Sequence, residues 1–135
     1  MGEILSRPLI QIVSNQDWKI DLVIPVPLSV ARKIERGYNQ AALLARPISL
    51  ATGWAYTPSA LLRTRETASQ VGLSIADRLI NVSGAFEGNR IKLDKKNVLL
   101  VDDVTTSGAT LMACSQALRL AGANEVYCVT LARAE

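Results

Sequence analysis

Runs of consecutive apolar residues alternate along the chain with segments whose apolar residues recur at helical spacing. Residues 98–101 are four consecutive apolar residues, typical of a strand covered on both faces. Residues 22–24 form a shorter run, and the strand should end at Pro25 and Pro27, because proline cannot donate to a sheet. Residues 126–131 predict a third buried strand.

Two segments have the spacing of helices with one buried face. The first follows Asn39, a residue type favoured at helix N-caps. Its apolar positions are Ala41, Leu44, Ala45 and Ile48. The second carries Leu111, Cys114 and Leu118 and ends at Gly122. Strand, helix and strand in this order predict a right-handed crossover, so we expect an α/β fold with a central, mostly parallel sheet flanked by helices.

The middle of the chain predicts shorter elements around a polar segment. Residues 60–63 favour a short strand, and residues 64–72 lack apolar periodicity, which indicates a loop. Ser74 and Asp77 have the spacing of a capping box, so we expect a short helix that ends near Asn81.

Length and composition predict a single domain over residues 1–135, with 49% hydrophobic and 20% charged residues. No apolar run approaches the roughly 20 residues that span a bilayer, so no membrane insertion is expected. Residues 1–15 lack the features of a signal peptide, which predicts a cytoplasmic protein. The net charge of +3 suits anionic ligands, whether small phosphates or nucleic acid, but 4% aromatic residues are few for base stacking.

The two cysteines and the absence of histidine exclude several chemistries. Cys114 and Cys128 lie in apolar patterns and are predicted to be core residues. Without histidine the chain cannot form the usual four-ligand zinc site from two thiols, nor a Ser-His-Asp or Cys-His nucleophile.

The strongest chemical signal follows the predicted central strand. Asp102 and Asp103 come just past its carboxyl end, the edge at which open α/β sheets bind ligands. The next residues bring backbone amides and hydroxyls to the start of a helix, which suits a phosphate dianion. These residues are Thr105, Thr106, Ser107, Gly108, Ala109 and Thr110. Because carboxylates repel the same phosphate, the acidic pair should address hydroxyls or Mg²⁺ beside it, so a phosphorylated sugar fits.

A purely structural interpretation of these residues stays open. Asp, Thr and Ser also terminate strands and cap helices. Capping needs one such side chain, however, and this loop supplies many. A Walker-type loop is excluded, because the chain has no Gly-x-x-x-x-Gly-Lys sequence.

Residues 98–110 resemble the phosphoribosyl pyrophosphate (PRPP) motif of type I phosphoribosyltransferases, in which two acidic residues precede a Thr/Ser/Gly loop. The resemblance extends to the ComF family of competence-associated proteins through residues 23–28, 36–40, 70–74, Arg78, 81–86 and 131–133. It implies a type I phosphoribosyltransferase-like fold, with PRPP or a nucleoside monophosphate as ligand and Mg²⁺ as cofactor. A homodimer and a link to the DNA-uptake machinery are further implications of the family.

The resemblance also implies residue roles. Asp102 and Asp103 would hold the ribose hydroxyls and, through water and ligand, Mg²⁺. The stretch from Thr105 to Thr110 would bind the 5-phosphate. The pyrophosphate loop would be Pro25, Val26, Pro27, Leu28 and Ser29. The lid over the reacting centre would be residues 64–72, with Arg63, Arg65 and Gln70 as its assigned residues.

Two departures from the family pattern bear on the activity. Family members usually begin with a cysteine-rich zinc module, which this chain lacks, so we expect either a shortened chain or a short branch. Thr106 occupies the position at which purine-type enzymes carry an acidic base. Three hypotheses follow: a phosphoribosyltransferase that releases pyrophosphate, a non-catalytic PRPP sensor, and a ComF-type component of DNA uptake.

Overall fold

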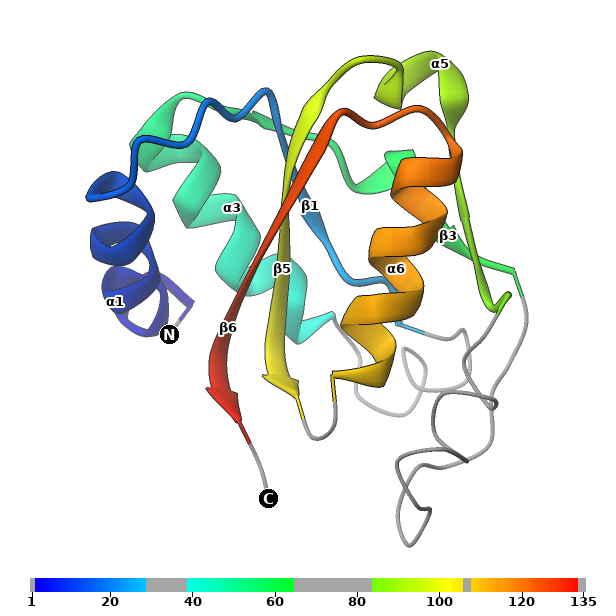
Figure 1. Ribbon diagram of the computed structural model, residues 1–135. Helices are drawn as coiled ribbons and strands as arrows, with labels where there is room; N and C mark the ends of the chain where they lie inside the picture. The colour runs from blue at the N-terminus through cyan, green and yellow to red at the C-terminus, as the bar shows by residue number, and fades with distance from the viewer. Residues whose placement is uncertain (1, 29–38, 65–83, 106–107, 134–135) are drawn as a thin grey trace, which may run out of the picture.

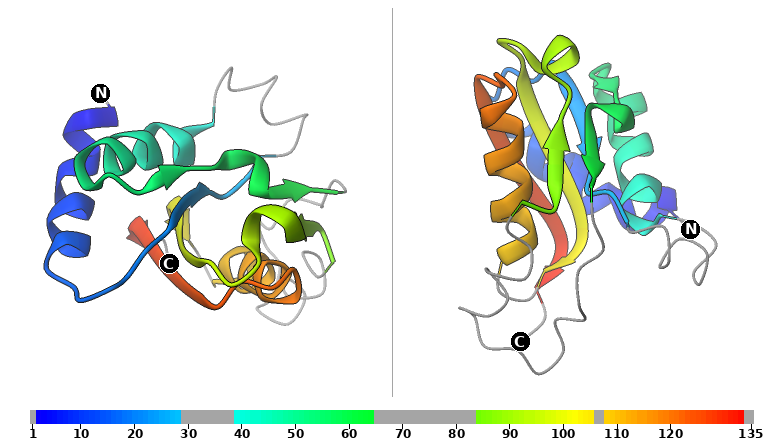
Figure 2. Two further views of the ribbon diagram at one scale, coloured as in Figure 1. Left: turned by 90° about the horizontal axis from the view of Figure 1, so that it is seen from above. Right: turned by 90° about the vertical axis from the view of Figure 1, so that its right-hand side faces the viewer.

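The computed structural model describes residues 2–28, 39–64, 84–105 and 108–133, which form a parallel sheet with helices on both faces. The sheet has the order β2-β1-β5-β6, built from β1 (Leu22–Pro25), β2 (Ala55–Tyr56), β5 (Asn97–Thr105) and β6 (Glu125–Arg133). Helices α1 (Gly2–Ser14) and α3 (Gln40–Thr52) cover one face, and α6 (Ala109–Leu120) covers the other (Figures 1 and 2). The predicted α/β fold is confirmed.

Strand β5 is the centre of the core, as its unbroken apolar run predicts. Val98 and Leu100 pack in the cluster under α6, whereas Leu99 and Val101 pack in the cluster under α1 and α3. All four side chains have no exposed surface. Alternate residues of a strand point to opposite faces, so a strand covered on both faces is apolar at every position.

Helix α3 follows the sequence prediction closely. Asn39 caps it by accepting hydrogen bonds from the amides of Ala41 and Ala42, and Gly53 ends it in the left-handed conformation. Ala41, Leu44, Ala45 and Ile48 are its buried residues. Helix α6 likewise buries Cys114 and Leu118 beneath it.

Strands β3 (Leu61–Arg63) and β4 (Phe86–Gly88) form a separate antiparallel ribbon beside α6. The short 3-10 helix η1 (Pro58–Ala60) precedes β3, and α5 (Arg90–Leu93) follows β4. The ribbon joins residues on both sides of the segment 65–83, which lies outside the described residues together with its predicted short helix. Among the described residues, no helix has the length and apolar character needed to cross a bilayer.

Three features differ from the sequence predictions. Helix α1 was not predicted, and Pro8 lies inside it. The aspartate pair lies within β5 instead of past its end, because β5 stays paired with β6 as far as Thr105 and Arg133. The buried-strand prediction for residues 126–131 and the core prediction for Cys128 are wrong: β6 is the last strand of the sheet that the described residues form, only Val129 among residues 126–131 is buried, and Cys128 is exposed.

Gly88 packs the ribbon against α6 and should not tolerate a side chain. A Cβ atom there would lie 2.7 Å from Ala121 Cβ and 2.8 Å from Leu93 Cδ1. We expect Gly88→Ala to lower the free energy of unfolding by about 1–3 kcal/mol, the usual cost of overpacking. Urea unfolding measures it, with Glu87→Ala, at an exposed site on the same strand, as the control. Equal stability of the two variants would contradict this packing.

Candidate functional site

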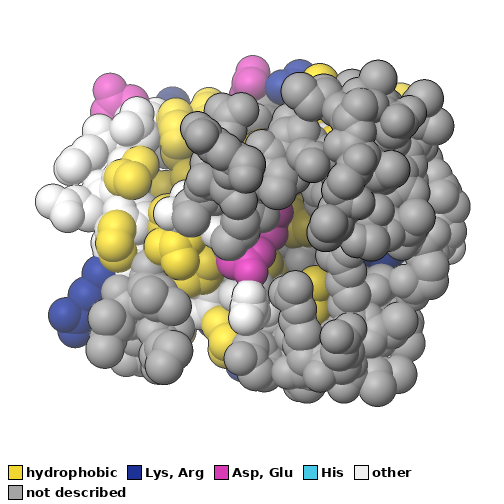
Figure 3. Space-filling view, turned by 90° about the horizontal axis from the view of Figure 1, so that it is seen from below, with side chains coloured by type: hydrophobic (Ala, Val, Ile, Leu, Met, Phe, Trp, Pro, Cys, Tyr) yellow, Lys and Arg dark blue, Asp and Glu magenta, His cyan; other side chains and the backbone are white. Residues whose placement is uncertain are grey.

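Backbone pairing brings the predicted acidic pair and the predicted pyrophosphate loop to the same edge of the sheet. Pro25 pairs with Val101, and the amide of Val26 donates to the carbonyl of Val101 at 2.9 Å. Asp102 is the next residue of β5. Seen from this end, acidic side chains lie near the middle of the face with hydrophobic side chains beside them (Figure 3). The carboxyl edge of a parallel sheet is where such folds bind ligands.

Asp102 is a buried acid on the α6 side of the sheet. It is 8% exposed, and its Oδ1 accepts a hydrogen bond from the amide of Asp103 at 2.9 Å. Burial raises the pKa of Asp102 to about 7, and the hydrogen bond and charge of the Asp103 side chain add to this effect. The guanidinium of Arg63 acts in the opposite direction. Ionising the Asp102 carboxyl therefore costs free energy in the free protein, and a bound cation or hydroxyl donor would offset that cost.

The acidic pair is tied to both neighbouring strands. Asp102 pairs with Thr130 of β6, whose hydroxyl lies 3.3 Å from the carbonyl oxygen of Asp103 and donates to it. Asp103 is half-buried. The backbone hydrogen bonds between β5 and β6 thus fix the points at which the two acidic side chains project from the sheet.

The proposed phosphate loop connects β5 to α6. Gly108 is the N-cap of α6 in the left-handed conformation, with φ of 79°. A Cβ at Gly108 would meet nothing within 4 Å, so the backbone conformation alone favours glycine there. The carbonyl of Gly108 accepts from the amide of Met112 at 2.9 Å, which closes the first turn. The segment therefore does end at a helix start, as predicted.

The structure describes only some of the other residues of the predicted phosphate loop. Thr105 is the last residue of β5, and Thr106 and Ser107 lie outside the described residues. Ala109 is buried, at 2% exposed, whereas Thr110 is half-buried.

The residues of the predicted pyrophosphate loop are held from two directions. Val26 is buried, and its carbonyl accepts from the side-chain amide of Asn39 at 3.1 Å. Pro27 and Leu28 are half-buried, and Ser29 lies outside the described residues. Asn39 thus caps α3 and anchors the chain after β1 with the same side chain.

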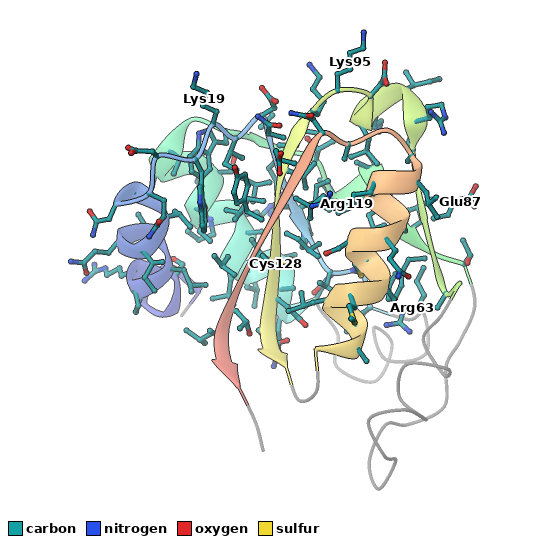
Figure 4. The ribbon with its side chains drawn as sticks, viewed as in Figure 1. Lys19, Arg63, Glu87, Lys95, Arg119 and Cys128 are labelled. Atoms are coloured by element: carbon teal, nitrogen blue, oxygen red, sulfur yellow. The ribbon has the colours of Figure 1, made fainter. Side chains whose placement is uncertain are left out.

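Arg63 links the ribbon to this edge of the sheet. Its Nε lies 3.5 Å from the carbonyl oxygen of Pro27, and its guanidinium carbon lies 4.7 Å from the centre of the Phe86 ring. The side chain is close to the N-terminal half of α6 (Figure 4) and influences the pKa of both Asp102 and Cys114. The other two predicted lid residues, Arg65 and Gln70, lie outside the described residues.

Sequence reasoning missed two parts of this arrangement. The Asn39 bond to Val26 and the Phe86 ring beneath Arg63 both depend on contacts between residues 13 or more positions apart. Asn39 carried a local signal only for helix capping, and no pattern around Phe86 indicated its partner.

The donor set of Asp102 and Asp103 fits Mg²⁺ held jointly with a ligand. No group of three or more acidic, cysteine or histidine side chains in the described part of the chain is placed to hold a metal ion. Mg²⁺ is commonly bound through one or two carboxylates together with substrate phosphates and water. Two adjacent carboxyl groups, one of them disfavoured in its charged form, match that kind of site.

Comparison with known proteins agrees with this geometry. The chain matches the family model of the phosphoribosyl transferase domain over residues 2–135. It is 40% identical over 119 residues to competence protein F of Haemophilus influenzae, covering 84% of this chain and 51% of that protein. It is 36% identical over 111 residues to the DNA utilization protein YhgH of Escherichia coli O157:H7, covering 81% of this chain and 48% of that protein. The chain thus spans about half the length of these relatives.

Solved structures give the same fold. Glutamine PRPP amidotransferase from B. subtilis, complexed with ADP and GMP, superposes with a TM-score of 0.66 and 25% identity, over 96% of this chain and 26% of that one. An adenine phosphoribosyltransferase superposes with a TM-score of 0.61 and 16% identity, over 98% of this chain and 68% of that one. With the sheet order and the family match, these likenesses confirm the predicted type I fold and the resemblance to ComF: the chain belongs to the phosphoribosyl transferase domain family.

Proposed function

We propose that this chain binds PRPP with Mg²⁺ at the carboxyl edge of its sheet. The observation that supports the proposal is that three segments of different chemistry lie at that edge. They are the acidic pair, residues 25–28 and the start of α6. The acidic pair takes the ribose hydroxyls, the start of α6 takes the 5-phosphate, and residues 25–28 take the pyrophosphate. Mg²⁺, when bound, would neutralise charge on the pyrophosphate.

We further propose that the bound donor is turned over. The bond from ribose C1 to pyrophosphate breaks, its electron pair leaves with pyrophosphate, and an acceptor lone pair forms the new bond to C1. Positive charge develops on the sugar ring in this step, and an ionised Asp102 beside the ribose stabilises it. The chain has no histidine, so the acceptor is either already nucleophilic or activated by a carboxylate, an amine or water.

Two measurements test binding and turnover separately. Calorimetry with PRPP, with and without Mg²⁺, is expected to give heat that depends on the metal. Mixing protein, PRPP, Mg²⁺ and a panel of nucleobases and amines is expected to release pyrophosphate. An absence of heat would refute the site, whereas heat without pyrophosphate across the panel would favour a non-catalytic sensor.

The sensor is the second candidate, and a specific observation favours it. Thr106 stands where purine-type enzymes of the resembled family carry an acidic base, and histidine is absent. A role in DNA uptake is a third candidate, which only the names of the relatives support: competence protein F and DNA utilization protein. It requires DNA binding whose affinity falls steeply with salt, because phosphate contacts release counterions.

Ligand binding should depend on pH through Asp102. Its pKa is raised to about 7, and the ionised form is the one that accepts from ribose hydroxyls and sits beside Mg²⁺. We expect the affinity for PRPP with Mg²⁺ to rise by about fivefold from pH 6 to pH 7 and to level off above about pH 8, as the ionised fraction of Asp102 does. Calorimetry across this range measures it. The Asp17→Asn variant, altered at an exposed acid, should show the same profile, and a flat profile in both proteins would contradict the role of Asp102.

The free protein should be more stable without the Asp102 charge. Between about pH 4 and pH 7 the native state keeps a proton on Asp102 that the unfolded chain loses, so the free energy of unfolding falls as the pH rises through this window. We expect Asp102→Asn to remove this fall and to raise stability at pH 8 by on the order of 2 kcal/mol, while abolishing the calorimetric response to PRPP. Urea unfolding at pH 4 and pH 8 measures it.

Asp17→Asn is again the control, since an exposed acid has no such cost. If Asp102→Asn is less stable than the parent chain at pH 8, then the Asp102 carboxylate contributes net stability in the free protein and the argument from burial is wrong.

A further inference from the structure

A groove lies between β4 and the C-terminal half of α6. Its volume is about 570 Å³, and it is lined by residues 86–91 together with Ala117, Leu120 and Ala121. Two of these side chains are apolar and project into solvent, since Ile91 is 93% exposed and Leu120 is 78% exposed. Large apolar side chains gathered around a hollow are typical of a surface that binds another molecule.

One wall of this groove is the free edge of a strand. Among the described residues, β4 pairs only with β3. The amide of Asn89 donates to the carbonyl of Ala60 at 2.8 Å, so the backbone of Asn89 faces the β3 side. Residues that face the partner strand alternate with residues that face away, so the amides and carbonyls of Phe86 and Gly88 point away from β3. Both residues line the groove, and strand edges of this kind pair readily with another chain.

The end of the groove at α5 is basic. Residues 90–96 carry four basic side chains and one acidic one, and all five are exposed. Arg90 lines the groove, and its Nη2 donates to the carbonyl of Leu120 at 2.8 Å. This bond holds the guanidinium between α5 and the last turn of α6. An acidic side chain in the groove would therefore have a charge partner at this end.

These three features together identify the occupant. A strand edge binds extended backbone, an apolar rim takes alternate side chains of an extended chain, and a basic end selects acidic residues. We infer that the groove binds an extended, acidic and apolar peptide segment of a partner protein, which adds as a strand to β4. Helix α5 lies at the opposite end of the sheet from the carboxyl ends of β5 and β6 (Figure 1), so the basic end of the groove is away from the acidic pair.

Synthetic peptides test the inference directly. The probe is a fluorescent peptide of about six residues in which valine and aspartate alternate, and its match has lysine in place of aspartate. We expect fluorescence anisotropy to show that the acidic peptide binds at least about tenfold more tightly than the basic one. Ile91→Asp should weaken binding by about tenfold or more, because it removes apolar surface and adds a like charge. Leu50→Asp, at an apolar residue of α3 that is 85% exposed, is the matched control and should leave binding unchanged.

The mode of binding has a test of its own. Methylating the backbone nitrogens of every second residue removes the donors on one side of the extended peptide. Of the two peptides methylated in alternate patterns, one should lose binding by about tenfold or more and the other should keep it, because only one side of an added strand bonds to β4. In the complex with the unmethylated peptide, NMR should show amide exchange at Phe86 and Gly88 slowed by about tenfold or more. The amide of Glu87 faces β3 and should change far less.

The opposite results overturn the inference. They include no binding of the acidic peptide at about 1 mM and equal weakening by Ile91→Asp and Leu50→Asp. Equal loss of binding by the two methylated peptides, or no loss by either, would show that the peptide does not add as a strand. Tighter binding of a single-stranded DNA oligonucleotide than of the acidic peptide, lost in Ile91→Asp, would assign the groove to nucleic acid instead.

Discussion

The pairing of β5 with β1 on one side and β6 on the other is the constraint on which this molecule depends. β5 is buried on both faces, so its position is fixed by the packing of two helical layers as well as by two ladders of hydrogen bonds. Because all these strands are parallel, their carboxyl ends meet at one edge. The acidic pair therefore reaches the site through the backbone of the most buried strand.

This placement explains why ionising Asp102 lowers the stability of the free protein. Asp102 is near the end of an apolar strand, where burial and a neighbouring acid both oppose its charged form. Moving the carboxyl into solvent would relieve the cost but would also release it from the β5 backbone. A binding site built on a rigid strand holds its side chains in precise positions. The cost is an electrostatic free energy, which a ligand donor or a cation offsets when it binds.

Sequence patterns predicted the elements whose burial is decided locally. β5, α3 and α6 follow directly from an unbroken apolar run and from helical spacing, and Asn39 was recognisable as a cap. The patterns could not predict that β6 lies at the edge, because an apolar run looks the same whether a strand has one neighbour or two. Cys128 was placed in the core for that reason. They also set the acidic pair beyond β5, since Asp is uncommon in strands and pairing with β6 overrides that preference.

The two halves of the site rest on different physical supports. Pro25, Val26 and Asp102 are fixed by sheet pairing and by the Asn39 bond to Val26, and the bond from the Met112 amide to the Gly108 carbonyl closes the first turn of α6. Arg63 instead comes from the β3–β4 ribbon. Its guanidinium packs over Phe86 of the same ribbon, and its Nε donates to the Pro27 carbonyl at the sheet edge. The proposed function assigns the sugar phosphate to the parts that sheet pairing holds. The β3–β4 ribbon forms a separate sheet, so its sequence can change without breaking the hydrogen bonds of β5. The proposal therefore constrains the donor more narrowly than the acceptor.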